Sequence, residues 1–230
     1  MSVFVLVHGS FSGGWKWKKV VPLLRQAGHR VSTPTLTGLG ERSHLVWPGL
    51  GLETHITDIV NVLRFNDLED VILAGHSWGG MVITGVAERV PERIARLVYV
   101  DAFVPHDGES VFSISPAAGE RGRARTVAGM TQPYEPEHWN ISDPEDAAWL
   151  QAHMVPMSIK THEDPIALPA YRAAELPRTY IWCTESAAFA PMARRARDEG
   201  MRYFELPTHH NPMVTMPREL TDILLTSAAE

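Results

Sequence analysis

The sequence predicts an α/β fold with a mostly parallel, doubly wound sheet of about six strands. The first observation is a series of short, continuous apolar runs without polar alternation, which are typical of strands covered on both faces. The second is that helical patterns lie between these runs, so that strand and helix alternate along the chain. The six predicted strands are Val3–Val7, His29–Leu36, Val71–Ala74, Leu97–Val100, Tyr180–Cys183 and Tyr203–Leu206.

The helical pattern is clearest in Thr54–Leu63, where apolar residues recur at i, i+3, i+4 and i+7 and form one stripe. Gly28 and Pro91 are typical of residues that follow the end of a helix. A proline near the start of the last pattern, Pro217, favours a first helical turn. The predicted helices are Val20–Ala27, Thr54–Leu63, Gly80–Val90 and one that begins near Pro217.

The composition limits the class of protein. The 230 residues are 44% hydrophobic and 21% charged, with a net charge of −6. This favours a folded chain and argues against a nucleic-acid partner. The single cysteine excludes an intrachain disulfide and a cysteine-rich metal site. No apolar stretch is long enough to cross a membrane and no basic leader precedes Val3, so we expect a cytoplasmic protein without a membrane partner.

The alternation of strands and helices stops between residues 104 and 177, where no clear strand is visible. A structureless stretch of this length is rare in a compact domain. Asp143 followed by Pro144 is typical of a helix start. We therefore predict an α/β core made of residues 1–103 and 178–230, with residues 104–177 inserted as a small helical cap.

Aromatic and methionine side chains are frequent in this insertion. They form either an apolar substrate pocket under the cap or the insertion's own core. The pocket interpretation places Trp139, Trp149 and Met154 in the cavity, together with Phe11 from the core.

Two further groups of residues in the insertion have less specific patterns. Three alternating arginines would either anchor an anionic substrate or lie in a solvated loop, and we expect the loop. The histidines lack the spacing of metal ligands, so no metal is expected. These residues are Arg121, Arg123 and Arg125, and His106, His138, His153 and His162.

The pattern Gly75-His76-Ser77-Trp78-Gly79 matches the G-x-S-x-G sequence of a nucleophile elbow. It follows a predicted strand and opens a predicted helix, which is the context that the pattern requires. Glycines two positions on either side leave room for a strained turn. The helix start also places partial positive charge beside Ser77. The alternative is a glycine-rich turn with an inert serine, but the context favours a nucleophile.

A serine nucleophile needs a general base, and the candidates are His8, His76, His209 and His210. His209 and His210 lie in the loop directly after the last predicted strand, where the base arrives in this kind of fold. One of this pair is therefore the predicted base. His76 lies inside the elbow, and we expect its side chain to point away from Ser77 as a structural residue.

An oxyanion is bound by two backbone N–H groups in this type of site. The first predicted donor is Trp78, the residue after the nucleophile. The second is expected from the loop after the first strand. Ser10 is the predicted donor there, because Gly9 would let the loop approach Ser77.

These motifs resemble the α/β-hydrolase superfamily and are most similar to its methylesterase and hydroxynitrile-lyase branch. The resemblance covers almost the whole chain and rests on Val5–Trp15, Thr37–Arg42, Gly75–Gly80 and His210–Met213. It implies an α/β-hydrolase fold with a Ser-His-Asp triad. Its residues would be Ser77 as nucleophile, His210 as base, and Ser10 and Trp78 as oxyanion donors.

The chain departs from that branch in the position of the triad acid. The branch usually has aspartate directly after Cys-Thr-Glu, whereas Glu185 here is followed by Ser186. Asp101 ends an apolar strand run, where an unpaired carboxylate would be costly to bury. We predict Asp101 as the acid. Glu185 is the alternative, and a serine or a water molecule in place of the acid is the remaining possibility.

The predicted function is hydrolysis of a carboxylic ester with an apolar or aromatic part, through an acyl-enzyme and without a cofactor. Hydroxynitrile lyases carry threonine and lysine where this chain has Gly9 and Asn211, so lyase activity is disfavoured. A lactone hydrolase, a C–C or cyanohydrin lyase, and a non-catalytic ligand receptor with a weakened triad are the alternatives. The expected partner is a small-molecule ester, and a homodimer is compatible with the sequence.

Overall fold

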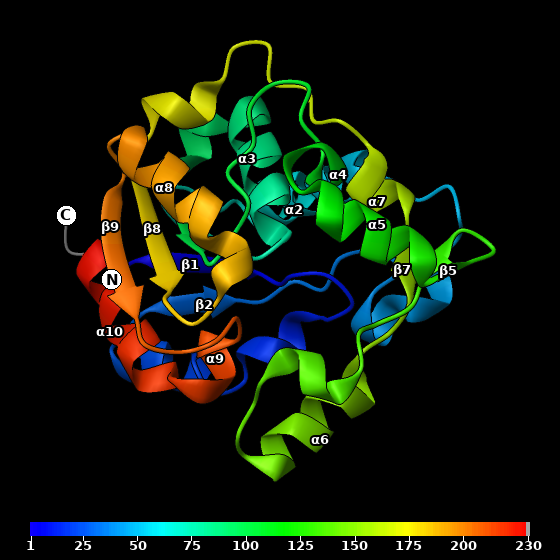
Figure 1. Cartoon of the computed structure of the whole chain (residues 1–230). Helices are drawn as coiled ribbons and strands as arrows, with labels where there is room; N and C mark the ends of the chain where they lie inside the picture. Colours follow the sequence, from blue (N-terminus) through cyan, green and yellow to red (C-terminus); the bar gives the residue numbers. More distant parts are fainter. Residues whose placement is uncertain (229–230) are drawn as a thin grey trace.

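The computed structural model describes residues 1–228. Six strands form one parallel sheet in the order β2-β1-β3-β4-β8-β9 (Figure 1). Because the chain extends the sheet first to one side of β1 and then to the other, the sheet is doubly wound, as predicted. The strands are β1 Val3–Val7, β2 Arg30–Ser32, β3 Val71–His76, β4 Ile94–Val100, β8 Arg178–Cys183 and β9 Arg202–Leu206.

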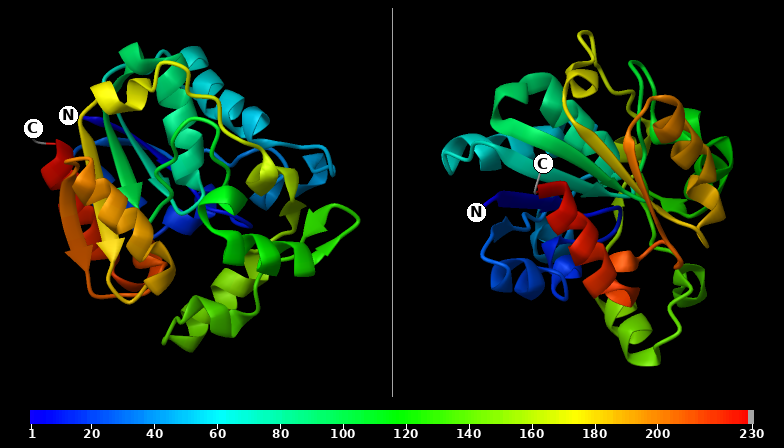
Figure 2. Two further views of the ribbon diagram at one scale, coloured as in Figure 1. Left: turned by 45° about the horizontal axis from the view of Figure 1, so that its top comes forward. Right: turned by 90° about the vertical axis from the view of Figure 1, so that its left-hand side faces the viewer.

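Helices cover both faces of this sheet (Figure 2). Residues of α2, α3 and α8 pack with Val5, Leu73 and Tyr99 on one face, and residues of α1, α9 and α10 pack with Phe4 and Ile72 on the other. Burial on both faces explains why the strand sequences do not alternate. These helices are α1 Val21–Gln26, α2 Leu52–Phe65, α3 Gly79–Arg89, α8 Ala190–Asp198, α9 Pro212–Thr215 and α10 Pro217–Ala228.

One predicted strand is too long. His29–Leu36 was expected to be extended throughout, but β2 ends at Ser32. Pro34 has no N–H group to donate to β1, so it cannot continue the pairing. The chain then runs to the short 3-10 helix η2 (Gly40–Leu45), and the other 3-10 helices are η1 Gly14–Trp17, η3 Pro91–Arg93, η4 Pro136–Trp139, η5 Arg172–Glu175 and η6 Ala187–Phe189.

Residues 104–177 add no strand to the main sheet and carry four short helices. Asp143 starts α6 as predicted, because its carboxylate accepts from the N–H groups of Glu145 and Asp146. The segment also holds a three-stranded antiparallel sheet that the sequence did not reveal, since each strand has only two residues. The elements are α4 Val111–Ile114, α5 Pro116–Ala124, β5 Thr126–Val127, β6 Met130–Thr131, α6 Pro144–His153, β7 Met157–Ser158 and α7 Lys160–Glu163.

Within residues 1–228, no helix combines the length and the apolar character that crossing a bilayer requires.

Candidate active site

The G-x-S-x-G turn joins β3 to α3 and holds Ser77 in the left-handed region, with φ of 58°. A Cβ atom on Gly75 would lie 2.6 Å from the carbonyl oxygen of Gly79, and one on Gly79 would lie 2.8 Å from that of His8. Only glycine fits at either position. The tight turn therefore presents the Ser77 side chain above the end of the sheet.

Two more sequence-predicted residues arrive at the same edge of the sheet. Asp101 directly follows β4, the neighbour of β3, and also has a positive φ, of 42°. His210 lies in the loop after β9. Because the carboxyl ends of parallel strands meet at one edge, residues far apart in the sequence are brought together there.

The three side chains form a continuous hydrogen-bonded chain. Ser77 Oγ lies 2.8 Å from His210 Nε2, and His210 Nδ1 lies 2.6 Å from Asp101 Oδ2. Since a carboxylate accepts, His210 Nδ1–H is the donor to Asp101, which leaves Nε2 to accept the Ser77 proton. Asp101 is completely buried, and its second oxygen accepts from the backbone N–H of Cys183 at 3.2 Å.

The alternative acid, Glu185, lies elsewhere. Its exposed carboxylate is 3.2 Å from Nε2 of His209, and the His209 ring also contacts the Glu185 carbonyl oxygen. The structure thus pairs His210 with Asp101 and His209 with Glu185. Of the two adjacent histidines, His210 is the one that approaches Ser77.

Two aromatic rings hold the His210 imidazole in place. The ring of Phe189 stacks on it with centroids 4.5 Å apart. The second ring is that of His76, whose centroid lies 4.6 Å from that of His210 and whose Nε2–H donates to the His210 carbonyl oxygen at 2.7 Å. Burial holds the pKa of His76 well below its ordinary value, so the ring is neutral. This buried histidine fixes the backbone of the residue that contacts Ser77.

Both predicted oxyanion donors have unpaired backbone N–H groups. Among residues 1–228, neither the Ser10 nor the Trp78 N–H donates to a protein acceptor. A Cβ atom on Gly9 would lie 2.9 Å from the Ser77 Cβ, so the predicted close approach of this loop is confirmed. The Ser10 hydroxyl is 2.8 Å from Nε2 of the buried His162, which links the loop to α7.

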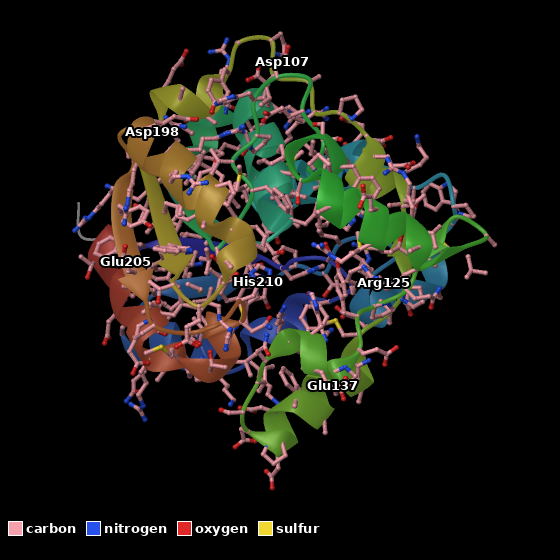
Figure 3. All side chains as sticks on the ribbon, viewed as in Figure 1. Asp107, Arg125, Glu137, Asp198, Glu205 and His210 are labelled. Atoms are coloured by element: carbon pink, nitrogen blue, oxygen red, sulfur yellow. The ribbon has the colours of Figure 1, made fainter. Side chains whose placement is uncertain are left out.

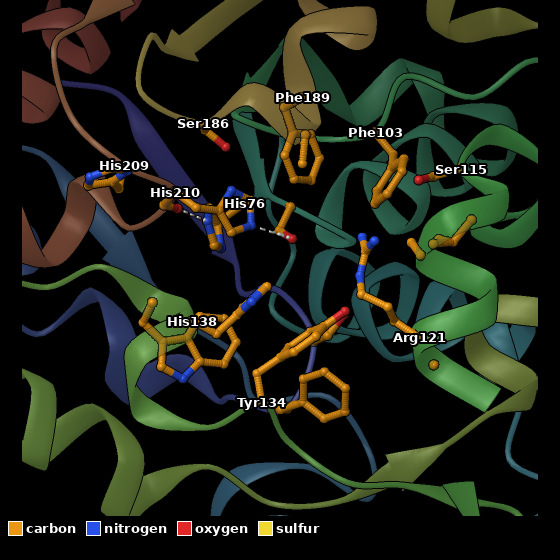
Figure 4. A pocket seen from close by; sticks show the side chains of 18 of the residues that line it. His76, Phe103, Ser115, Arg121, Tyr134, His138, Ser186, Phe189, His209 and His210 are labelled. Carbon is orange, nitrogen blue, oxygen red and sulfur yellow. Dashed lines mark hydrogen bonds between the residues drawn. The ribbon is translucent and has the colours of Figure 1, made fainter. Parts of the chain in front are cut away.

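A cavity of about 360 Å³ opens beside Ser77. Figure 4 shows Phe103 and Phe189 on one side of it, and Tyr134 and His138 on the other. Phe11 and Trp139 line it, as predicted. Rings from the core and from residues 104–177 thus enclose a largely apolar space.

Trp149 and Met154 do not line this cavity, contrary to prediction. Trp149 turns toward η1, where it packs edge-on against Trp15 with centroids 5.1 Å apart and lies under the ammonium group of Lys18. Met154, at the end of α6, packs against the hydrophobic core. The orientation of α6 decides these contacts, and helical spacing alone does not reveal it.

The sequence reasoning missed several charged residues of the cavity. Lys16 of η1 lines it, and no pattern in the sequence indicates that this lysine is buried. Arg121 and Arg125 were expected in a solvated loop. Instead, Arg121 lies in α5 and extends into the cavity (Figure 4). Arg125, which directly follows α5 at i, i+4 from Arg121, also lines the cavity. The i, i+4 spacing of these two arginines is the feature of the sequence that could have predicted their common position.

Acidic side chains lie mostly away from this centre. Figure 3 shows His210 in the middle of the molecule and Asp107, Asp198 and Glu205 toward its outside, and all three carboxylates are exposed. Within the described residues, no group of three histidine, cysteine or carboxylate side chains has the arrangement of a metal site.

Comparison with known proteins agrees with this architecture. Residues 4–223 match the model of the alpha/beta hydrolase family. A carbendazim hydrolyzing esterase of Nocardioides sp. (strain SG-4G) is 40% identical, over 97% of this chain and 98% of that protein. Salicylic acid-binding protein 2 of Nicotiana tabacum is 27% identical, over 98% of this chain and 95% of that protein.

A solved structure of similar fold supports the same family assignment. An extracellular α/β-hydrolase from a Paenibacillus species, described as sharing structural and functional homology with tobacco salicylic acid binding protein 2, has a TM-score of 0.87. It is 26% identical and covers 98% of both chains. Methylesterase 1 of Arabidopsis thaliana is 26% identical, over 98% of this chain and 95% of that protein. These relatives confirm the resemblance to the methylesterase branch. The chain belongs to the alpha/beta hydrolase family.

Proposed function

We propose that this protein is a serine esterase that hydrolyses a carboxylic ester with an apolar or aromatic part. The hydrogen-bonded chain Ser77–His210–Asp101 is the observation that carries the proposal. The relatives named carbendazim hydrolyzing esterase and methylesterase support ester hydrolysis. The aromatic lining of the cavity supports the apolar substrate part.

The reaction begins when His210 Nε2 takes the Ser77 proton and Ser77 Oγ attacks the ester carbonyl carbon. The negative charge then moves to the carbonyl oxygen, toward the free N–H groups of Ser10 and Trp78. His210 returns its proton to the departing alkoxide, which leaves as an alcohol. Asp101 keeps the imidazole in the required tautomer and stabilises the imidazolium.

The resulting acyl-serine is released by water. His210 removes a proton from the water molecule, whose oxygen attacks the acyl carbon, and the proton then returns to Ser77 Oγ. The products are the free acid and the unmodified enzyme. In this scheme residues 104–177 serve as the cap that encloses the ester and excludes bulk water.

A fluorophosphonate probe tests the proposal directly. We expect covalent labelling at Ser77, found by mass spectrometry of the tryptic peptide, and no labelling of the Ser77→Ala variant. A panel of p-nitrophenyl esters then measures the preferred acyl length. A folded wild-type protein that neither labels nor turns over any ester would instead support a ligand receptor on this fold.

A further inference from the structure

Lys16 has an unusual environment for a lysine. Its side chain is only 2% exposed, and among residues 1–228 its ammonium group has neither an ion-pair partner nor a hydrogen-bond acceptor. The nearest described contact is the face of Trp139, whose ring centroid lies 5.8 Å from Nζ. Lysines usually extend their ammonium group to water, which this one does not do.

The group lines the cavity that holds Ser77. The other lining cations, Arg121 and Arg125, raise the local positive charge further. Glu185 is the one carboxylate among the lining residues, and it faces His209. The cavity is therefore cationic although the chain as a whole carries a net charge of −6.

A buried ammonium without a counter-charge is unfavourable, because transfer from water is not repaid by a partner. Burial accordingly lowers the pKa of Lys16 to about 7. A neutral side chain of similar size would pack at this position without that cost. A ligand anion in the cavity that Lys16 lines would supply the missing partner.

We propose that Lys16 binds a carboxylate of the substrate, so that the preferred ester carries an anionic group on its apolar body, as in a half-ester of a dicarboxylic acid. This rests on the proposed esterase function. The ester group would lie at Ser77 and the carboxylate at Lys16, with the aromatic lining against the part between them. The structure thus provides both an apolar wall and, when Lys16 is protonated, a positive charge for one ligand.

Arg125 already donates to the Gln132 carbonyl oxygen and lies over the Tyr134 ring, which leaves Arg121 as the competing cation. It extends from α5 into the cavity, but its side chain is exposed, so water screens its charge (Figure 4). Lys16 is almost completely buried, and a carboxylate beside it is paired in a low-dielectric environment. For this reason the proposal assigns the carboxylate to Lys16.

The experiment measures binding in the Ser77→Ala background, so that no turnover is needed. The probes are monomethyl succinate and monomethyl adipate. Their neutral partners are methyl 4-methylpentanoate and methyl 6-methylheptanoate, in which an isopropyl group replaces the carboxylate. We expect at least one half-ester to bind more tightly than its partner by isothermal titration calorimetry. Adding Lys16→Met should weaken that half-ester about tenfold or more and change the neutral ester less than about twofold.

Lys18→Met is the matched control, because Lys18 belongs to the same stretch but lies over Trp149. It should leave both affinities unchanged, and Lys16→Met should melt at the same or a higher temperature than its parent.

The proposal is overturned if no half-ester binds more tightly than its neutral partner, if Lys16→Met weakens both ligands equally, or if only Arg121→Met weakens the half-ester. Fluorophosphonate labelling of Ser77 would be unaffected by any of these results, so the two proposals fail independently.

Discussion

The main sheet and residues 104–177 contribute to the same cavity in different ways. Ser77 and Asp101 follow strands whose residues are almost all buried, and tight backbone geometry fixes both. Tyr134, His138 and Arg121, from residues 104–177, are partly or fully exposed and come from short helices and loops. A substitution near the sheet therefore disturbs a close-packed structure, whereas one in residues 104–177 changes mainly what the cavity accepts.

This difference separates the residues that carry out the reaction from those that select the substrate. Groups that transfer protons must be positioned within tenths of an ångström, which rigid strand ends achieve. Groups that recognise the rest of a substrate tolerate more variation. We therefore expect large effects on turnover from substitutions at the sheet edge, and smaller, substrate-dependent effects from those in residues 104–177.

The largest effect is expected for His210→Ala. Removing the proposed base should lower kcat for p-nitrophenyl butyrate about 10⁶-fold, as in serine proteases whose triad is broken. His209→Ala is the matched control, since His209 contacts Glu185 rather than Ser77, and it should keep kcat within about threefold. A similar loss in both variants would show that the assignment of the base is wrong.

Asp101→Asn comes next. The amide cannot hold His210 in the same tautomer, so kcat should fall about 10⁴-fold while the fold is retained. Glu185→Gln should have little effect on the same assay. Wild-type activity of the first variant together with inactivity of the second would identify Glu185 as the acid.

Gly9→Ala is expected to have an intermediate effect. The new methyl group would meet the Ser77 Cβ at 2.9 Å and displace the loop that carries the Ser10 N–H. Loss of one oxyanion donor costs roughly 10²- to 10³-fold in kcat. Ser10→Ala keeps the backbone N–H and loses only the contact with His162, so its kcat should fall by less than about tenfold. Equal losses of kcat in Gly9→Ala and Ser10→Ala would show that the Ser10 hydroxyl, rather than its backbone N–H group, is responsible for the effect.

The affinity of the proposed carboxylate site for an anionic ligand should fall as the pH rises. Because the pKa of Lys16 is about 7, its positive charge is lost as the pH rises, so the affinity of Ser77→Ala for a half-ester should fall about tenfold between about pH 6 and about pH 8.5. Burial lowers the pKa of the neighbouring His8 to about 3 and that of His76 well below its ordinary value, so neither ring gains charge in this range. Titration calorimetry on the Lys16→Met variant should show a flatter profile, and an unchanged slope would exclude Lys16 as its source.

The smallest expected change is Tyr134→Ala, within residues 104–177. Tyr134 lines the cavity and is only partly buried, so its removal should enlarge the space for the acyl chain. The preference between butyrate and octanoate p-nitrophenyl esters should shift toward octanoate about tenfold, with kcat for the acetate ester almost unchanged. A large loss of kcat for acetate would mean that this segment takes part in the reaction itself.

The strand ends could be predicted from the sequence because local signals define them. Apolar runs, the G-x-S-x-G turn and the residue directly after each run suffice to place Ser77 and Asp101 at one edge. Choosing between Asp101 and Glu185 as the partner of His210 required coordinates, since both follow strands near the same edge. The pairing of His209 with Glu185 is a contact that spacing does not predict.

The cavity of residues 104–177 was less predictable for a physical reason. Its helices are short, and their orientation depends on contacts with distant segments. Trp149 and Trp139 belong to one stretch, yet only Trp139 reaches the cavity. The ammonium group of Lys16 lies over the ring of Trp139, which is distant in the sequence, and no local pattern around Lys16 indicates its burial.

The packing of α6 on η1 has a consequence for measurement. Trp139, which covers Lys16, donates its indole N–H to Gln151 of α6, while Asp146 of the same helix pairs with Lys19. Lifting α6 would therefore hydrate the Lys16 ammonium and return its acidity toward that of a lysine in water. The Nζ resonance of Lys16 would therefore report, in solution and without any substrate, whether α6 is packed on η1.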